Sequence, residues 1–314
     1  MPLPPKAHSE QRELIIGYSL VLLGALGFSA KAILIKLAYT ANLDVDAITL
    51  MALRMLFALP FFLLVAAWRN KKTPAQPLAK KQWAAVIVLG LMGYYIASYL
   101  DFIGLQYISA GLERVIIFLY PTFVVLFSAL VYRQRITARV AIALGLSYIG
   151  TMLVFIEHLS TASSGLLLGS GLVLSSAVIF SWFVMGSGVM TQSIGSARFT
   201  AYTMTVASVA TLVHFAFRHG APLTHNFTLN YPAWERVLSL AFIMAIFSTV
   251  LPAFFMNAGI RRIGAGSASI ISTTGPIATL VLAYMLLGEA ITWIQLAGTF
   301  FVLAGVYAVG RVKL

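Results

Sequence analysis

Ten apolar stretches, each close to the length that a helix needs to cross a lipid bilayer, follow one another along the chain. A crossing takes roughly 20 apolar residues. Only 10% of the 314 residues are charged and 60% are hydrophobic, whereas roughly 25% of the residues in a typical soluble domain are charged. The sequence therefore predicts an all-α membrane protein with ten transmembrane helices. The predicted spans are residues 14–38, 46–68, 83–106, 110–132, 137–156, 165–190, 197–217, 234–259, 266–287 and 292–311.

Positive charge alternates between the connections. Most of the 21 Lys and Arg residues lie before the first span, after the last span or in every second connection. Because loops rich in Lys and Arg stay in the cytoplasm, we expect both termini there, with residues 1–13 as an N-terminal tail. The net charge of +12 is therefore a sign of topology, and it does not indicate a nucleic-acid partner.

The second half of the chain repeats the first. At an offset of 155 residues, Gly104 aligns with Gly259 and Pro121 with Pro276, and the starts of the halves align at an offset of 152. Because five spans are an odd number, the second copy enters the membrane from the opposite side. Such inverted repeats are typical of transporters, whose substrate site lies between the repeats near the midplane. The predicted repeats cover residues 14–156 and 165–311.

Two long segments carry a resemblance to a known family. Residues 104–132 read GLQYISAGLERVIIFLYPTFVVLFSALVY, and residues 258–292 read AGIRRIGAGSASIISTTGPIATLVLAYMLLGEAIT. The small residues at the start, the proline within the helix and the Gly-Glu exit resemble the EamA-type permeases of the drug/metabolite transporter superfamily. One departure is Arg133-Gln134 in the place of Gly288-Glu289. The resemblance implies ten helices, an inner-membrane location, and export or exchange of small metabolites.

Five ionisable residues inside the predicted spans are the first site candidates, because charge within a bilayer is costly and usually functional. They are Lys31, Arg54, Asp101, Glu113 and Arg114, all in the first half and near the outer ends of their spans. We expect pairs such as Arg54 or Arg114 with Asp101, and Lys31 with Glu113. Two interpretations stay open: a structural ion-pair network, or an outer vestibule that binds an anionic or zwitterionic substrate.

The two aligned prolines indicate helices that line a central cavity, because proline removes a backbone donor and kinks a helix. The alternative is that they only shape the packing. Polar and aromatic residues in the spans complete the predicted substrate pathway. With Pro121 and Pro276, these further candidates are Tyr94, Tyr95, Ser98, Tyr120, Asn257, Ser272 and Thr273.

The sequence contains no pattern that indicates an enzyme. The chain has no cysteine, and its histidines lack the spacing of metal ligands. Neither a nucleophile elbow nor a phosphate-binding loop is present, so we expect no metal, no cofactor and no direct use of ATP. The predicted function is a secondary transporter that exports a small metabolite, amino-acid-like or other, by alternating access. The alternative is a non-transporting membrane scaffold or sensor.

Several properties stay open at this level. The sequence does not identify the substrate, the direction of transport or the coupling ion, although Asp101 and Glu113 are the candidate proton carriers. Gly165 and Gly169 have the spacing of a helix-packing motif, which leaves a homodimer open. The expected partners are a small-molecule substrate and the lipid bilayer.

Overall fold

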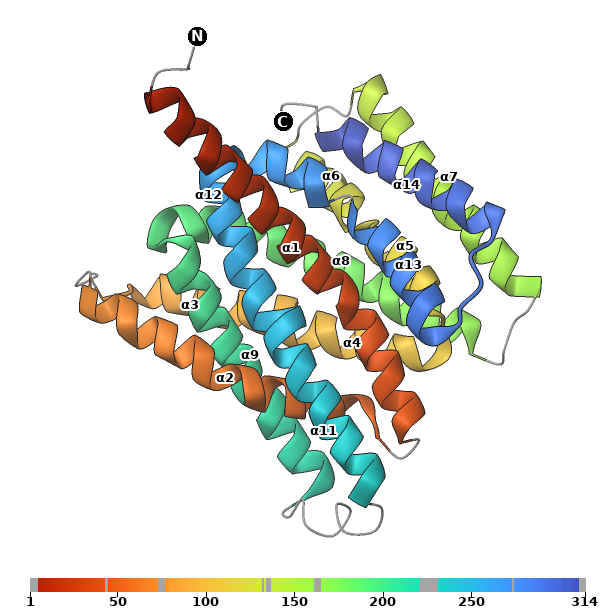
Figure 1. Cartoon of the computed structure of the whole chain (residues 1–314), viewed down its shortest axis with the longest axis horizontal. Coiled ribbons are helices and arrows are strands. Elements are labelled where there is room, and N and C mark those ends of the chain that lie inside the picture. The colour runs from red at the N-terminus through yellow and green to blue at the C-terminus, as the bar shows by residue number, and fades with distance from the viewer. Residues whose placement is uncertain are drawn as a thin grey trace.

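The computed structural model describes residues 5–42, 45–72, 77–131, 133, 137–160, 165–220, 231–272 and 274–310. All regular elements in these ranges are helices (Figure 1). In the first half they are α1 (Pro5–Ala41), α2 (Ala47–Lys72), α3 (Lys80–Gly90), η1 (Leu91–Ile96), α4 (Ala97–Tyr107), α5 (Ala110–Ile117), α6 (Tyr120–Val131) and α7 (Ala138–Ser160). In the second half they are α8 (Leu166–Ile194), α9 (Ser196–His219), α11 (Tyr231–Ala245), η2 (Ile246–Val250), α12 (Leu251–Ser272), α13 (Thr274–Leu287) and α14 (Trp293–Gly310).

Seven helical stretches are long and apolar enough to cross a membrane, and three shorter apolar helices accompany them within the described ranges. Large apolar side chains such as Leu64, Phe217 and Trp293 lie exposed on the outside of the bundle. Lipid stabilises such an apolar surface. Helices can lie in lipid because they satisfy their own backbone hydrogen bonds. The chain is a multi-pass membrane protein.

Two π-helical segments interrupt long helices at aligned places. The segment η1 joins α3 to α4, and η2 joins α11 to α12, each without a break in the helical path. Their first residues, Leu91 and Ile246, are separated by the same 155 residues that align the two halves. A π-helical turn inserts an extra residue and widens a helix locally, and such turns recur at functional sites.

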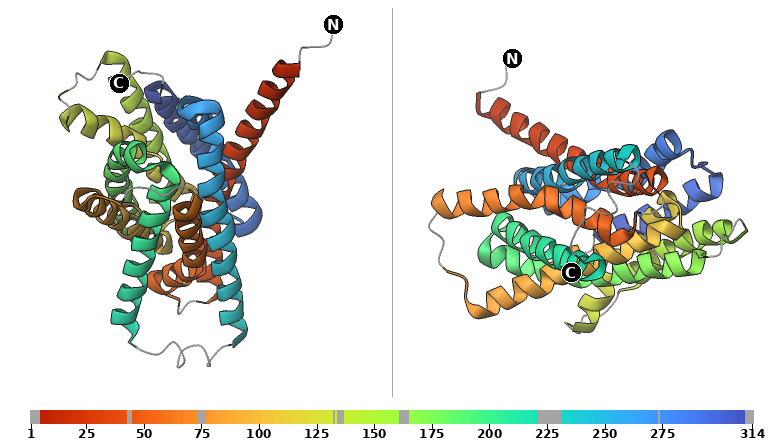
Figure 2. Two further views of the ribbon diagram at one scale, coloured as in Figure 1. Left: turned by 90° about the vertical axis from the view of Figure 1, so that its left-hand side faces the viewer. Right: turned by 90° about the horizontal axis from the view of Figure 1, so that it is seen from below.

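The bundle is organised by helix pairs that link the two halves of the chain. Helix α1 packs along α12, α4 along α8, α2 along α9, and α7 along α14. Figure 1 shows α7 and α14 side by side at one edge of the molecule, and Figure 2 shows the N-terminal part of α1 extending beyond the other helices. The predicted tail of residues 1–13 is thus helical from Pro5 onward.

Glycines mark the closest crossings of two of these pairs. A Cβ atom added at Gly104 of α4 would lie 3.0 Å from the carbonyl oxygen of Gly169 and would also collide with Val173, both on α8. A Cβ atom added at Gly259 of α12 would lie 2.9 Å from the carbonyl oxygen of Gly17 and would collide with Val21, both on α1. The absence of a side chain at Gly104 and Gly259 therefore permits both crossings.

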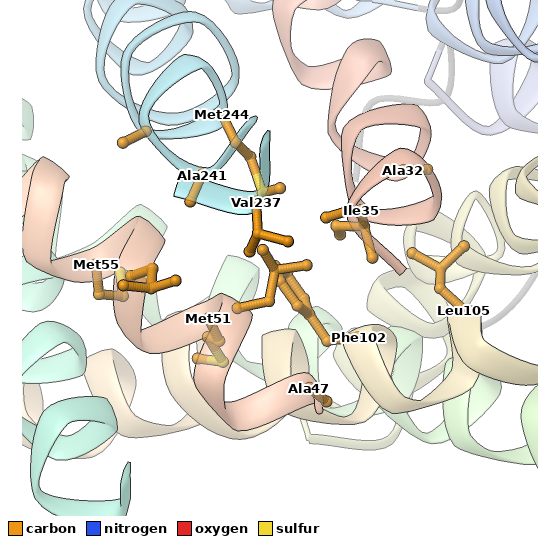
Figure 3. Packing of buried hydrophobic residues seen from close by; sticks show 14 of the residues in the cluster. Ala32, Ile35, Ala47, Met51, Met55, Phe102, Leu105, Val237, Ala241 and Met244 are labelled. Atoms are coloured by element: carbon orange, nitrogen blue, oxygen red, sulfur yellow. The ribbon is translucent and has the colours of Figure 1, made fainter. Parts of the chain in front are cut away.

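The largest buried apolar cluster lies where α1, α2, α4 and α11 meet. Figure 3 shows Met51 and Met55 of α2 packed near Val237 of α11 and Phe102 of α4. A second cluster joins α5, α7, α8 and α14 through residues such as Leu112, Val154, Val173 and Val302. The two clusters fix α4 and α5, which carry three of the ionisable site candidates.

One predicted span contains a turn, and one predicted span boundary is wrong. The span predicted at residues 110–132 is present as the stretch Ala110–Val131, in which a turn at Phe118 and Leu119 separates α5 from α6, because Pro121 has no N–H to donate to Ile117. The expected connection at residues 260–265 is helical and belongs to α12. Between Pro252 and Pro276 the chain contains no proline, so backbone hydrogen bonds continue through this stretch.

Candidate functional site

Five ionisable side chains from four helices form the centre of the candidate site, and we call them the charged cluster: Lys31 of α1, Arg54 of α2, Asp101 of α4, and Glu113 and Arg114 of α5. Arg54, Asp101, Glu113 and Arg114 are buried, and Glu113 has an exposed fraction of 0%. Glu113 lies within electrostatic range of Asp101, Arg114 and Lys31. The cluster is thus one electrostatic unit inside the bundle.

The ion pairs in the charged cluster differ from those expected. The Lys31 Nζ atom lies 2.6 Å from Asp101 Oδ2, so Lys31 pairs with Asp101 rather than with Glu113. The Arg114 Nε atom lies 3.9 Å from Glu113 Oε2, while Arg114 Nη2 donates to the Phe28 carbonyl at 3.0 Å. The physical reason is that α4 packs beside α1, which places Asp101 within reach of the long Lys31 side chain.

Arg54 has a different environment from the other cations. Its guanidinium lies over the Phe102 ring, 4.8 Å from the centroid. Among the described residues, no carboxylate lies within 4.0 Å of its nitrogens, and the buried Nε and Nη2 atoms have no hydrogen-bond partner. Asp101 Oδ1 and both oxygens of Glu113 accept no hydrogen bond from a nitrogen or hydroxyl donor of the described residues, although the two carboxyl groups lie within hydrogen-bonding reach of each other. The charged cluster therefore contains unused donors on Arg54 and acceptors that no N–H or O–H donor satisfies.

Ser29 connects the charged cluster to the second half of the chain, and the sequence did not single it out as a site residue. Its hydroxyl donates to the Gly275 carbonyl of α13 at 3.0 Å. Its own carbonyl accepts from Arg114 Nη2 at 3.4 Å and from Thr279 Oγ1 at 3.3 Å. No local sequence pattern singles out Ser29, because its contacts with Gly275, Arg114 and Thr279 join distant segments.

A second link between the halves lies at the corner between α4 and α5. Glu289, from the connection between α13 and α14, accepts from the backbone N–H groups of Ala110 at 3.0 Å and Gly111 at 3.2 Å. Lys36 of α1 donates to the carbonyls of Leu105 and Ile108 at the end of α4. An anion at a helix N-terminus and a cation at a C-terminus are both favoured by the helix dipole.

The aromatic residues of the predicted pathway pack against other helices, and Tyr120 also lies within electrostatic range of Arg114. Tyr94 packs edge-on against Phe183 at 4.8 Å between centroids. The Tyr95 hydroxyl lies 2.9 Å from Nδ1 of His214 on α9. Tyr120 packs edge-on against Phe180.

The second-half candidates lie on α12 and α13. Ser272 donates to the Ala268 carbonyl of its own helix, and Pro276 is buried in the first turn of α13. Asn257 is partly buried on α12, as is Ser98 on α4, and Pro121 lies in the first turn of α6. Thr273 lies outside the described residues.

Within the described part of the chain, His, Asp and Glu side chains form no group of three that could hold a metal ion.

Comparison with known proteins places these features in a family. The model of the EamA-like transporter family matches residues 15–156 and again residues 167–311. The chain belongs to the EamA-like transporter family. A relative from Bacillus subtilis (strain 168), the uncharacterized transporter YcbK, is 32% identical over 303 residues, which cover 95% of this chain and 94% of the relative.

Two further proteins are similar to this chain over most of its length. The uncharacterized transporter sll1319 of Synechocystis sp. is 25% identical and covers 90% of both chains. A solved structure, described only as the crystal structure of a protein, superposes with a TM-score of 0.59 over 96% of this chain and 98% of its own. Its sequence identity is 17%, so this likeness concerns the fold alone. Membership of this family makes the protein a membrane transporter.

Proposed function

We propose that the protein is a secondary transporter that exports a small organic metabolite across the inner membrane by alternating access. In this proposal the seven long spans and the three shorter apolar helices together make ten crossings. Residues 14–156 and 165–311 form two inverted five-helix repeats, and both termini lie in the cytoplasm. The family assignment across both halves supports this arrangement.

The helix pairs support the repeat. Under the alignment of the halves, α1 corresponds to α8 and α4 to α12, so a two-fold relation exchanges the α1–α12 pair with the α4–α8 pair. Both pairs are in contact, and each has an aligned glycine, Gly259 or Gly104, at its closest crossing. The aligned positions of η1 and η2 also support this two-fold relation. Two such units can rock against each other around a central site.

The observation that carries the transport proposal is the set of unpartnered polar atoms in the charged cluster. A purely structural ion-pair network is expected to satisfy its buried members, because unpaired buried polar groups are costly. Here Arg54 and Glu113 are buried and keep unused donors and acceptors. A site that receives a polar solute explains these atoms, whereas helix packing alone does not.

The link between Glu289 and α5 suggests how one end of the pathway is held closed. Glu289 belongs to the second half, and the backbone groups that it binds belong to the first. Rocking of the halves separates these partners, so the bond has to break when this end opens. The aligned residue at the opposite end is Gln134, which lies outside the described residues.

Efflux from cells tests the proposal. Cells that produce the intact protein, Glu113→Gln, Arg54→Ala or the control Arg236→Gln are loaded with labelled metabolites, after each variant is shown to reach the membrane folded. Arg236 is exposed on α11, so its loss removes the same charge away from the cluster. Efflux that stalls in the two cluster variants alone supports the proposal. Equal efflux in all variants makes the cluster structural, and no efflux of any solute favours a scaffold or sensor.

A further inference from the structure

The charges of the cluster do not balance. The three cations Lys31, Arg54 and Arg114 face the two carboxylates Asp101 and Glu113. Lys31 is paired with Asp101 at 2.6 Å and Arg114 with Glu113 at 3.9 Å. The excess positive charge is therefore located on Arg54. Asp101 lies close enough for its charge to act on Arg54, but Lys31 already neutralises that carboxylate.

The free atoms of Arg54 have a recognisable geometry. Nε and Nη2 lie on the same edge of the planar guanidinium, and both are buried without hydrogen-bond partners among the described residues. Two parallel N–H groups on one edge match the two oxygens of a carboxylate, which is why arginine binds carboxylates in a bidentate manner. Phe102 covers a face of the guanidinium at 4.8 Å, and this contact leaves the edge of the group free. The unpaired Nε and Nη2 edge of the Arg54 guanidinium therefore matches the geometry of a carboxylate.

The acceptors of the two carboxyl groups can receive donors from the same solute. Asp101 Oδ1 and both Glu113 oxygens accept no hydrogen bond from a nitrogen or hydroxyl donor of the described residues, and Glu113 and Asp101 lie within hydrogen-bonding reach of each other. A hydroxyl or amide N–H group satisfies them without adding charge. A zwitterion satisfies these atoms too, but its ammonium group leaves the excess positive charge of the cluster uncompensated. A neutral solute leaves Arg54 unpaired, and a cation increases the imbalance.

We propose that the charged cluster takes a small organic anion of net charge −1, with its carboxylate on Nε and Nη2 of Arg54 and its hydroxyl or amide groups on Glu113 and Asp101. This inference rests on the proposed transport function and narrows its substrate to one charge class. A hydroxy acid is the simplest solute with both features.

Counterflow in proteoliposomes tests the charge class directly. The purified protein is reconstituted and preloaded with one solute of each class: gluconate as the hydroxylated anion, glutamine as the zwitterion, sorbitol as the neutral solute and choline as the cation. Uptake of the same labelled solute is then measured. We expect counterflow for gluconate above the other three. Counterflow for glutamine, sorbitol or choline in preference to gluconate overturns this inference and leaves the transport proposal standing, whereas no counterflow by folded protein overturns both.

Variants of Arg54 locate the anion. Loss of the bidentate contact in Arg54→Gln should raise the half-saturating gluconate concentration by roughly 10- to 100-fold. Arg54→Lys keeps the charge and should recover part of that loss, which separates binding from folding. The exposed control Arg236→Gln should leave the half-saturating concentration unchanged. An unchanged value in Arg54→Gln, or the same rise in Arg236→Gln, contradicts the assignment of the carboxylate to Arg54.

Discussion

Replacing Glu289 by glutamine should loosen the corner between α4 and α5. The Glu289 carboxylate accepts from two consecutive N–H groups, of Ala110 at 3.0 Å and Gly111 at 3.2 Å. A hydrogen bond to a charged group contributes about 1.5–3 kcal/mol, and a charge at a helix N-terminus adds about 0.3–1 kcal/mol. Glutamine keeps one acceptor oxygen and loses the charge, so we expect a loss of about 2 kcal/mol in local stability.

Hydrogen exchange measures this loss where it occurs. A decrease of about 2 kcal/mol in the free energy of local opening corresponds to roughly 30-fold faster amide exchange. Mass spectrometry of peptides that cover residues 106–117 should show this increase in Glu289→Gln. The control is Glu235→Gln, because Glu235 is an exposed carboxylate on α11. Unchanged exchange in α5, or an equal increase in every helix, refutes the reasoning.

Two further predictions concern the ion pair and the helix crossings. Asp101→Asn removes the charge that Lys31 faces at 2.6 Å, and because Lys31 is partly exposed, we expect a loss of about 1.5–3 kcal/mol, as for one hydrogen bond to a charged group. A melting temperature in detergent within error of the intact protein refutes this. Gly104→Ala and Gly259→Ala should each destabilise by about 1–3 kcal/mol through collisions at the crossings, whereas Gly171→Ala, which meets no atom within 4 Å, should not. Unequal losses of stability in Gly104→Ala and Gly259→Ala would argue against the equivalence of the α4–α8 and α1–α12 crossings.

The sequence predicts the members of the charged cluster better than their partners. Hydropathy places an ionisable residue inside a span, so all five members could be named in advance. A pair, however, depends on how far each helix is rotated about its axis and on which helix lies beside it. Lys31 reaches Asp101 because α1 and α4 are neighbours. No local sequence pattern predicts that these two helices pack together.

Contacts between distant segments account for what the sequence missed. Glu289 and Ala110 are 179 residues apart, and a loop carboxylate gives no local sign that it binds the N-terminus of another helix. His214 attracts notice as a histidine within a predicted span, but its bond to the Tyr95 hydroxyl crosses from α9 to η1. Glycine and arginine at residues 260–265 predict a loop, whereas this stretch is helical within α12.

The most direct test of alternating access follows one buried position from both sides of the membrane. The chain contains no cysteine, so Ser29→Cys introduces a single thiol next to Arg114 and Gly275. Ser29 has an exposed fraction of 1%, and serine and cysteine are close in size. Intact cells and inside-out vesicles are treated with a small membrane-impermeant thiol reagent. The account predicts labelling from each side, with the rate changed by a transported solute. Labelling from neither side, or from one side alone under all conditions, would contradict it.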